Sequence, residues 1–301
     1  MLEKIKPWLS AFRLRTLPLS VSGIIIGSCF AHYNGYFNGM IMTFAILLTI
    51  SLQILSNLAN DYGDGIRGTD NDDRIGPERA IQSGAISPEE MFDAIKMNIL
   101  VVIVLTVGLI FVSFGSKYFL YALLFFVLSG LSVFAAINYT VGSSPYGYRG
   151  LGDLFVFVFF GVLSVVGSYF LYTKHIDHHV VLPAIALGLL SMGVLNLNNM
   201  RDIDTDKAAG KETLAVKLGK MNAKRYHIVL IVLAMLISFV FSILYYSRIY
   251  NFLFFIAYIP LSIHLIKVYK ADNPKAFDPQ LKVLALTTFL FSLLLGIGYI
   301  L

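Results

Sequence analysis

Two clusters of aspartates are the residues of this sequence whose types and spacing could do chemistry. Asp61 and Asp64 lie three residues apart, and Asp202 and Asp206 lie four apart. On a helix each pair would project from one face, because residues three and four apart are neighbours on its surface. Carboxylates that share a face repel one another unless a cation joins them. We expect Mg²⁺ to be this cation, because it takes one or two carboxylates and completes its octahedron with water and phosphate oxygens.

Basic side chains accompany both clusters. Arg67 follows the first pair, and Arg201 and Lys211 lie on either side of the second. A site for a metal ion alone has no use for these bases, whereas a diphosphate does, because Arg and Lys bind phosphate oxygens. The residue types therefore predict a site in which acids hold a metal ion, the ion holds a diphosphate, and bases hold the remaining oxygens.

These charged clusters belong to an apolar chain. Of 301 residues, 57% are hydrophobic and only 14% are charged, whereas about 25% of an average soluble protein is charged. The apolar runs are continuous and suit helices of about 20 residues, not the alternating ten-residue strands of a membrane barrel. We therefore predict an all-α, polytopic membrane protein. A charge at the centre of a bilayer costs at least about 2.5–3.5 kcal/mol, so acids beside a span call for a function.

Nine apolar segments are long enough to cross the membrane. They are residues 17–33, 39–58, 92–114, 118–137, 154–172, 180–198, 226–246, 250–269 and 281–301. The acidic clusters follow the second and sixth segments, and each begins with Asn-Leu. This weak repetition predicts two four-helix halves plus a ninth helix around a central cavity. We expect residues 1–301 to form a single domain, with basic and aromatic residues 1–12 as a helix at the membrane surface.

The distribution of basic residues predicts the orientation. Nine spans place the two termini on opposite sides, and the 23 Lys and Arg residues then divide 20 to 3, with Lys117, Lys174 and Arg248 on the poorer side. By the positive-inside rule the N-terminus and both aspartate clusters are cytoplasmic. Three histidines, His175, His178 and His179, fall in an outer loop. We interpret them as solvated polar residues and not as a metal site.

No motif argues for a nucleotide, a zinc ion or a nucleic acid. The sequence has no Walker motif, no dinucleotide fingerprint and no His-Glu-x-x-His, and its single cysteine, Cys29, cannot form a ligand set. The diphosphate should therefore belong to the substrate, whose organic part should be apolar in a membrane cavity. A cation transporter is the alternative from another class. Its acids would lie near the bilayer midplane, whereas these lie at span ends. No obligate protein partner is evident.

The sequence resembles the UbiA superfamily of intramembrane aromatic prenyltransferases. The resemblance rests on Asn57-x-x-x-Asp61-x-x-Asp64 and Asp202-x-x-x-Asp206 on nine predicted spans. More narrowly, it is similar to members that prenylate 1,4-dihydroxy-2-naphthoate in menaquinone synthesis, over residues 13–18, 53–64, 73–77, 146–153, 198–202 and 210–214. It departs from the common motif where Gly68 replaces an acid. Three acids follow this position, and which of them contacts metal stays open: Asp70, Asp72 and Asp73.

The resemblance implies roles for individual residues. It implies four Mg²⁺ ligands: Asp61, Asp64, Asp202 and Asp206. It implies three amides that orient them: Asn57, Asn60 and Asn199. It implies three diphosphate contacts: Arg67, Arg201 and Lys211. The implied reaction, in a bacterial cytoplasmic membrane, ionises the allylic C–O bond of a polyprenyl diphosphate, after which the ring of 1,4-dihydroxy-2-naphthoate attacks the carbocation and loses its carboxylate as CO₂.

The aromatic acceptor could bind near the loop between the fourth and fifth spans. This loop and its edge contain Tyr139, Arg149 and Asp153. Arg149 could instead be a positive-inside anchor, and Asp153 could cap the helix that follows. Another acceptor, such as 4-hydroxybenzoate or a porphyrin, is an alternative within the same enzyme class. The extended motif disfavours it, but a sequence does not define the shape of a pocket.

Overall fold

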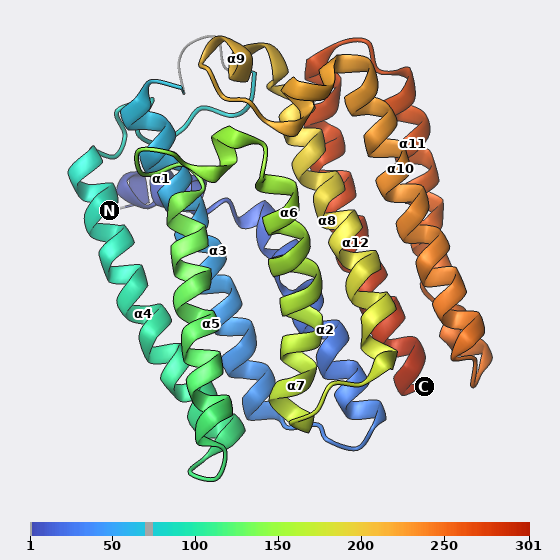
Figure 1. Cartoon of the computed structure of the whole chain (residues 1–301). Helices are drawn as coiled ribbons and strands as arrows, with labels where there is room; N and C mark the ends of the chain where they lie inside the picture. Colours follow the sequence, from blue (N-terminus) through green and yellow to red (C-terminus); the bar gives the residue numbers. More distant parts are fainter. Residues whose placement is uncertain (1, 70–74) are drawn as a thin grey trace.

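The computed structural model describes residues 2–69 and 75–301, and all regular elements within these ranges are helices. Nine helical segments among the described residues are long and apolar enough to cross a membrane. They lie side by side in one bundle (Figure 1). The prediction of an all-α protein with nine spans is therefore confirmed. The three acids whose metal contacts were left open, Asp70, Asp72 and Asp73, fall outside the described residues.

The spans are built from longer and shorter helices. In chain order these are α1 (Leu2–Phe12), η1 (Leu14–Thr16), α2 (Leu17–Tyr33), α3 (Gly39–Arg67), α4 (Pro88–Phe114), α5 (Phe119–Asn138), η2 (Tyr146–Arg149), α6 (Gly152–Val156), η3 (Phe157–Gly167), α7 (Ser168–Thr173), η4 (His178–Val180), α8 (Val181–Arg201), α9 (Ile203–Ala208), α10 (Leu214–Leu244), η5 (Ile249–Phe252), α11 (Phe255–Lys270), η6 (Pro274–Ala276) and α12 (Phe277–Ile300). The fifth span joins α6, η3 and α7, and η3 is a π-helix.

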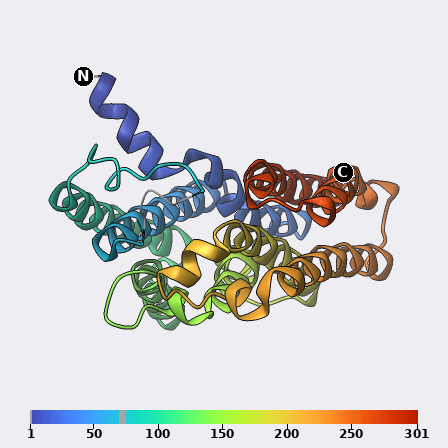
Figure 2. The same ribbon diagram turned by 90° about the horizontal axis from the view of Figure 1, so that it is seen from above.

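α1 differs in direction from the spanning helices. It lies near the upper end of the bundle (Figure 1) and projects away from it when seen from above (Figure 2). The chain turns at Arg13, whose φ of 49° and ψ of 58° lie in the left-handed region that side chains rarely adopt. Pro18 then lies in the first turn of α2, where its fixed φ suits a helix. The predicted N-terminal helix is present, and its direction suits the membrane surface.

Small residues allow two close approaches between segments of the bundle. A Cβ on Gly161 of η3 would lie 2.6 Å from the Cα of Gly188 in α8, so these two backbones touch. A Cβ on Gly63 of α3 would lie 2.6 Å from the hydroxyl of Thr140. The second approach holds the loop after α5 against the last turns of α3, where the first aspartate cluster lies.

α3 continues well past the predicted end of its span. The sequence predicted a span over 39–58, whereas α3 runs without interruption to Arg67 and ends at Gly68, whose φ is 69°. Asp61 and Asp64 therefore project from helical turns. The second cluster follows α8 at the same end of the bundle, where Asp202 separates α8 from the short α9. α12 packs against both α2 and α8 and so connects the two sides of the bundle.

Candidate active site

Lys211 connects the two aspartate clusters. Its ammonium Nζ lies 3.8 Å from Oδ2 of Asp64 and 3.6 Å from Oδ1 of Asp206. Burial works against the charge of this ammonium, but the two carboxylates outweigh burial and raise the pKa of Lys211. Clusters that are far apart in the sequence thus meet around one positive charge, as the predicted shared site requires.

Asp61 lies deeper in the first cluster and is only 1% exposed. The backbone N–H of Ala80 donates to its Oδ2 at 3.2 Å, and that of Ile81 donates to its Oδ1 at 3.5 Å. Backbone donors fix a carboxylate without neutralising its charge. These two bonds therefore orient Asp61 from the segment that follows the first cluster.

Asp202 is held by Arg201. Nε and Nη2 of Arg201 donate to the two oxygens of Asp202 at 2.8 and 2.7 Å. Nη1 donates to Oδ1 of Asp278 in α12 at 2.6 Å, and Nη2 also donates to Asn198 at 3.0 Å. The Arg201 side chain is 1% exposed. In this structure Arg201 orients Asp202 and joins α8 to α12. These bonds use four of the five N–H groups of the guanidinium, so one N–H of Nη1 can still serve a diphosphate.

The donor set fits a hard divalent cation. Its oxygens come from four buried carboxylates, which is the ligand type that Mg²⁺ prefers: Asp61, Asp64, Asp202 and Asp206. Burial raises the pKa of Asp206 to about 6, Lys211 opposes this effect, and the charges of Asp202 and Asp64 add to it. Asp206 thus accepts a proton more readily than an ordinary aspartate does. A divalent cation bound beside it would favour its charged form.

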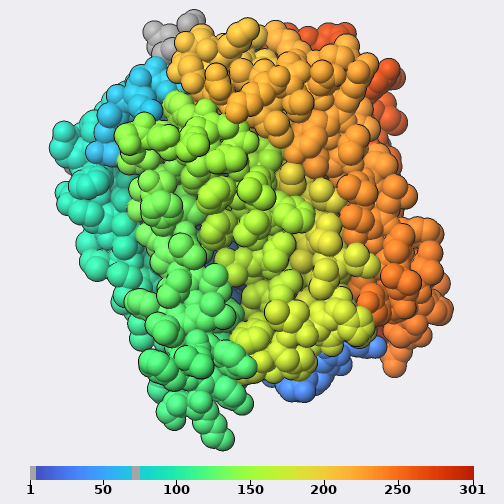
Figure 3. Space-filling view, in the orientation of Figure 1, coloured from blue at the N-terminus to red at the C-terminus, as the bar shows by residue number. Residues whose placement is uncertain are grey.

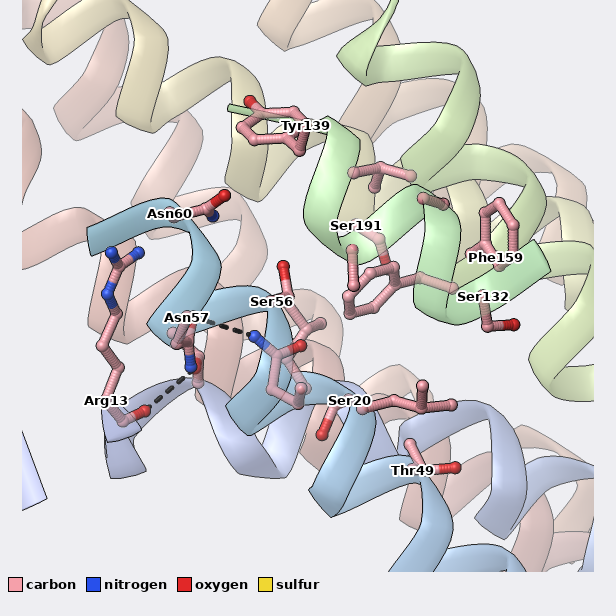
Figure 4. A pocket seen from close by; sticks show the side chains of 18 of the residues that line it. Arg13, Ser20, Thr49, Ser56, Asn57, Asn60, Ser132, Tyr139, Phe159 and Ser191 are labelled. Carbon is pink, nitrogen blue, oxygen red and sulfur yellow. Dashed lines mark hydrogen bonds between the residues drawn. The ribbon is translucent and has the colours of Figure 1, made fainter. Parts of the chain in front are cut away.

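Four of the predicted metal and diphosphate residues line one end of a long cavity of about 670 Å³: Asp61, Asp64, Arg201 and Lys211. The other predicted metal and diphosphate residues are not among the lining residues: Asp202, Asp206 and Arg67. Along α3 its lining runs from Ala45 to Asp64, which is about 28 Å at 1.5 Å per residue. In the close-up, Asn60, Asn57, Ser56 and Thr49 follow one another along this face of α3 (Figure 4). Away from the acids the lining is mainly apolar, with contributions from α2, α4, α5 and η3. The surface is hollowed between α5 and the α6–η3 segment (Figure 3).

Tyr139 lies in the cavity, and Arg149 does not. Tyr139 is among the lining residues, and burial together with the charges of Asp206 and Asp64 raises the pKa of its hydroxyl. The side chain of Arg149 is exposed and is not part of the cavity lining, and its carbonyl accepts a hydrogen bond from Lys217 at 2.8 Å. In this structure Arg149 therefore does not reach the cavity, and its role in binding the acceptor stays a prediction. Asp153 accepts a hydrogen bond from Tyr226 at 3.1 Å.

Two of the three asparagines bond to neighbouring segments. Nδ2 of Asn57 donates to the carbonyl of Phe12 at 2.9 Å, which fastens α3 to the end of α1. Asn60 accepts from Thr140 at 3.3 Å, and Asn199 is buried within α8. Asn57 and Asn60 thus position the segments around the acids, and neither has a carboxylate among its hydrogen-bond partners given by the described residues.

Several polar residues near the acids were not predicted. Arg13 and Arg79 line the cavity, Asp278 binds Arg201, and Tyr148 donates a hydrogen bond to Asp64. Arg13 and Tyr148 belong to segments 13–18 and 146–153, which supported the family resemblance, so a signal existed for these two. No sequence pattern predicted the role of Asp278, because its partner Arg201 lies far away in the sequence.

The structure describes a second group of possible metal ligands at the other end of the bundle. Asp177, His178 and His179 have ligand atoms within 4.8 Å of one another. Nδ1 of His179 lies 2.6 Å from Oδ1 of Asp177, and the side chain of His178 is 73% exposed. Asp177 also accepts the backbone N–H of His179 and so caps η4. The interpretation of these histidines as solvated polar residues stays a prediction.

Comparison with known proteins gives consistent matches. The model of the UbiA prenyltransferase family matches residues 20–293. The 1,4-dihydroxy-2-naphthoate octaprenyltransferase of Haemophilus influenzae is 42% identical over 298 residues, which cover 98% of this chain and 96% of that protein. The protein of the same name from Escherichia coli strain K12 is 41% identical, with 99% and 96% covered.

Solved structures match over nearly the whole chain. A UbiA homolog from Archaeoglobus fulgidus bound to GPP and Mg²⁺ has a TM-score of 0.66 at 14% identity, covering 98% of this chain and 99% of that one. The apo structure of a UbiA homolog from Aeropyrum pernix K1 has a TM-score of 0.65 at 17% identity, covering 95% and 97%. At these low identities the solved structures establish the fold alone. Family membership rests on the match to the family model and on the two octaprenyltransferases.

Proposed function

We propose, since this chain belongs to the UbiA prenyltransferase family, that it transfers a polyprenyl group from polyprenyl diphosphate to 1,4-dihydroxy-2-naphthoate. The products would be diphosphate, CO₂ and the demethylmenaquinol of menaquinone synthesis. One observation carries the proposal: buried acids joined by a lysine lie at the end of a long, mainly apolar cavity. This arrangement matches a substrate with a charged head and a long apolar tail.

The residues at the acidic end would act on the charged head. Asp61, Asp64, Asp202 and Asp206 would hold Mg²⁺, whose positive charge supports departure of the diphosphate. Lys211 lies between the two clusters and would bind phosphate oxygens once a metal ion takes over the carboxylates. Burial strengthens all these interactions, because few waters compete with them. The allylic C–O bond would break here, and the leaving diphosphate would keep the electron pair.

The apolar part of the cavity would hold the prenyl tail. Burial from water stabilises each CH₂ by about 0.8 kcal/mol, but transfer from lipid to an equally apolar groove gains almost nothing. Tail length should therefore be limited by room and not by affinity. The lining along α3, about 28 Å, is comparable to the roughly 30 Å hydrocarbon core of a bilayer, so a long tail could run beside this helix.

The acceptor would lie beside Tyr139, at the border between the charged and apolar parts. The raised pKa of Tyr139 keeps its hydroxyl protonated, so that it can donate a hydrogen bond to the acceptor. The ring would attack the carbocation, and the ring–carboxylate bond would break to release CO₂ and restore the aromatic ring. This loss returns an electron pair to the ring.

We place the acidic end of the bundle in the cytoplasm of a bacterium, on the 20 to 3 division of the basic residues. Single cysteines in a Cys29→Ser background test this orientation. An impermeant thiol reagent applied to intact cells should label a cysteine at His178, at the opposite end, and should not label one at Thr205. The reverse pattern would overturn the orientation.

A transfer assay tests the proposed reaction. Purified protein in lipid nanodiscs would receive octaprenyl diphosphate, Mg²⁺ and 1,4-dihydroxy-2-naphthoate labelled in its carboxylate. We expect one labelled CO₂ for each prenylated product, and loss of both after chelation of the metal. Equal or faster transfer to 4-hydroxybenzoate, or a product that keeps the label, would contradict the proposal.

A further inference from the structure

Tyr148 contacts the first aspartate cluster and the loop of Lys211 from a third segment of the chain. It lies in η2, between the fifth span and α5, and none of the roles proposed above uses it. Its hydroxyl donates to Oδ1 of Asp64 at 2.8 Å. Its carbonyl accepts the backbone N–H of Glu212 at 3.1 Å, next to Lys211. One residue therefore connects the end of α3 to the loop that carries the bridging lysine.

The hydroxyl of Tyr148 has a defined direction. Because it donates to Asp64, the hydroxyl of Thr69, 2.7 Å away, must donate to it. Thr69 follows the end of α3 directly, so both partners of the hydroxyl belong to the first cluster. This pair of bonds fixes one oxygen of Asp64 and leaves the other, Oδ2, facing Lys211 at 3.8 Å.

The ring of Tyr148 holds two cations. The guanidinium carbon of Arg67 lies 5.0 Å from the ring centroid, and the ammonium of Lys211 lies 5.2 Å from it. Both distances are within the roughly 6 Å at which the negative face of an aromatic ring attracts a cation. The guanidinium of Arg67 also donates to the carbonyl of Gly142. Two like charges that would otherwise repel are thus held by one ring, and one of them, Lys211, also faces Asp64.

We propose that Tyr148 is a positioning residue for the diphosphate head. This inference rests on the proposed function, because Arg67 and Lys211 matter only if a diphosphate binds between the clusters. The ring keeps both cations directed at the phosphates, and the hydroxyl orients Asp64. The two parts of the side chain therefore make separate contributions that single substitutions can separate.

A role in folding alone would have a different signature. Loss of a residue that only packs lowers stability and affects both substrates alike. Loss of a residue that positions phosphate-binding cations raises the Michaelis constant for prenyl diphosphate and leaves that for the aromatic acceptor nearly unchanged. The ratio of the two constants thus distinguishes the two roles.

The experiment compares Tyr148→Phe and Tyr148→Leu with matched changes at Tyr62. Tyr62 lies at the same end of α3 and stacks on Phe92, 5.5 Å between ring centroids. The full-length variants in nanodiscs would be assayed for both Michaelis constants. Binding of inorganic pyrophosphate with Mg²⁺ would be measured by calorimetry, and binding of Mn²⁺ by electron paramagnetic resonance. The last two measurements need no turnover.

We expect Tyr148→Leu to raise the Michaelis constant for prenyl diphosphate about tenfold and to weaken pyrophosphate binding about tenfold. Tyr148→Phe keeps the ring and should weaken Mn²⁺ binding about threefold, with a smaller effect on pyrophosphate. The constant for the acceptor should stay within about twofold in both, and both Tyr62 variants should match the wild type in all four measurements.

Two results would overturn the proposal. One is pyrophosphate binding by Tyr148→Leu equal to that of the wild type. The other is an equal rise of both Michaelis constants. If Tyr148→Leu does not give a monodisperse protein, a Tyr148→Phe variant with wild-type Mn²⁺ affinity overturns it on its own. Failure of the wild type to prenylate the naphthoate would instead count against the proposed function, and the pyrophosphate measurement would still decide the role of Tyr148.

Discussion

The two aspartate clusters look alike in the sequence and differ in the structure. Asp61 and Asp64 lie on the last turns of one continuous helix, and neutral groups donate to both: backbone N–H groups to Asp61 and a tyrosine hydroxyl to Asp64. Asp202 lies at a break between α8 and α9, and the guanidinium of Arg201 covers both its oxygens. Asp61 and Asp64 line the cavity, whereas Asp202 and Asp206 are not among its lining residues.

This difference suggests that the two clusters contribute unequally to metal binding within one site. Because Asp61 and Asp64 line the cavity, the first cluster should dominate the affinity for a metal ion that binds there with the substrate. In the second cluster a metal ion must compete with Arg201, whose buried position Asp278 helps to maintain. The second cluster should therefore respond more to its surroundings. The predictions below test this comparison, from the largest expected effect to the smallest.

Removal of one charge from the first cluster should have the largest effect. We expect Asp61→Asn to lower kcat/KM by about 1,000-fold and Asp202→Asn by about 100-fold, within the range for loss of a single electrostatic group at a buried site. Asp204→Asn is the matched control, because Asp204 is exposed and pairs with Lys220 at 2.7 Å. Steady-state kinetics checks this. A greater loss for Asp202→Asn, or an equal loss for Asp204→Asn, would break the comparison.

Loss of the cation between the clusters should make stability depend on metal. Lys211→Met leaves Asp64 and Asp206 buried without their shared ammonium. We expect Tm without Mg²⁺ to fall by about 2–4 °C, for a loss of about 1 kcal/mol, and Mg²⁺ to restore most of it. Lys220→Met removes a lysine from an exposed ion pair. It should change neither the Tm without Mg²⁺ nor the rise in Tm that Mg²⁺ causes. A Lys211→Met protein that Mg²⁺ does not stabilise would contradict a metal site between these acids.

The raised pKa of Asp206 predicts a pH dependence. Its pKa rises from an ordinary 3.8 to about 6, so the folded protein binds a proton there more tightly than the unfolded chain does. This contribution to stability is complete below about pH 4 and is lost as the pH rises through 6. Mg²⁺ competes with the same proton, so the rise in Tm that Mg²⁺ causes should grow several-fold between pH 5 and 7. Thermal unfolding at several pH values, with and without Mg²⁺, measures this rise in Tm. If the rise in Tm is the same at pH 5 and pH 7, and is also seen in Asp206→Asn, Asp206 does not belong to the metal site.

The smallest effect is expected at Arg149. Because its side chain is exposed and outside the cavity lining, Arg149→Ala should change the Michaelis constant of the aromatic acceptor by less than about twofold. Kinetics with both substrates decides this. A tenfold rise confined to the acceptor would mean that Arg149 reaches the cavity in the loaded enzyme and that the sequence interpretation was right.

The sequence predicted the features that follow from hydrophobicity and periodicity. Nine apolar runs gave the nine spans, and two acidic clusters at corresponding ends indicated one shared site. The end of α3 was missed because Gly63 and Gly65 are typical of turns. In the structure they lie in a helix with close neighbours, since a Cβ on Gly65 would lie 2.8 Å from Ile81.

Directions of side chains and remote partners could not be predicted. Tyr148 and Arg149 are adjacent in one short helix, yet Tyr148 faces Asp64 and Arg149 faces solvent. The family resemblance implied a diphosphate contact for Arg201 and gave no sign of its protein partners. Its second partner, Asp278, lies at the start of the last span and comes close only after folding.

An experimental structure with Mg²⁺, a non-hydrolysable prenyl thiolodiphosphate and 1,4-dihydroxy-2-naphthoate tests the central claim most directly. That claim is that the two clusters form one site for the diphosphate head, with the tail in the cavity along α3. We predict density for the two phosphates between Asp64 and Asp206, in contact with Lys211, and density for the tail along the face of α3 that lines the cavity. A diphosphate bound at one cluster alone, or a tail outside this cavity, would contradict the account.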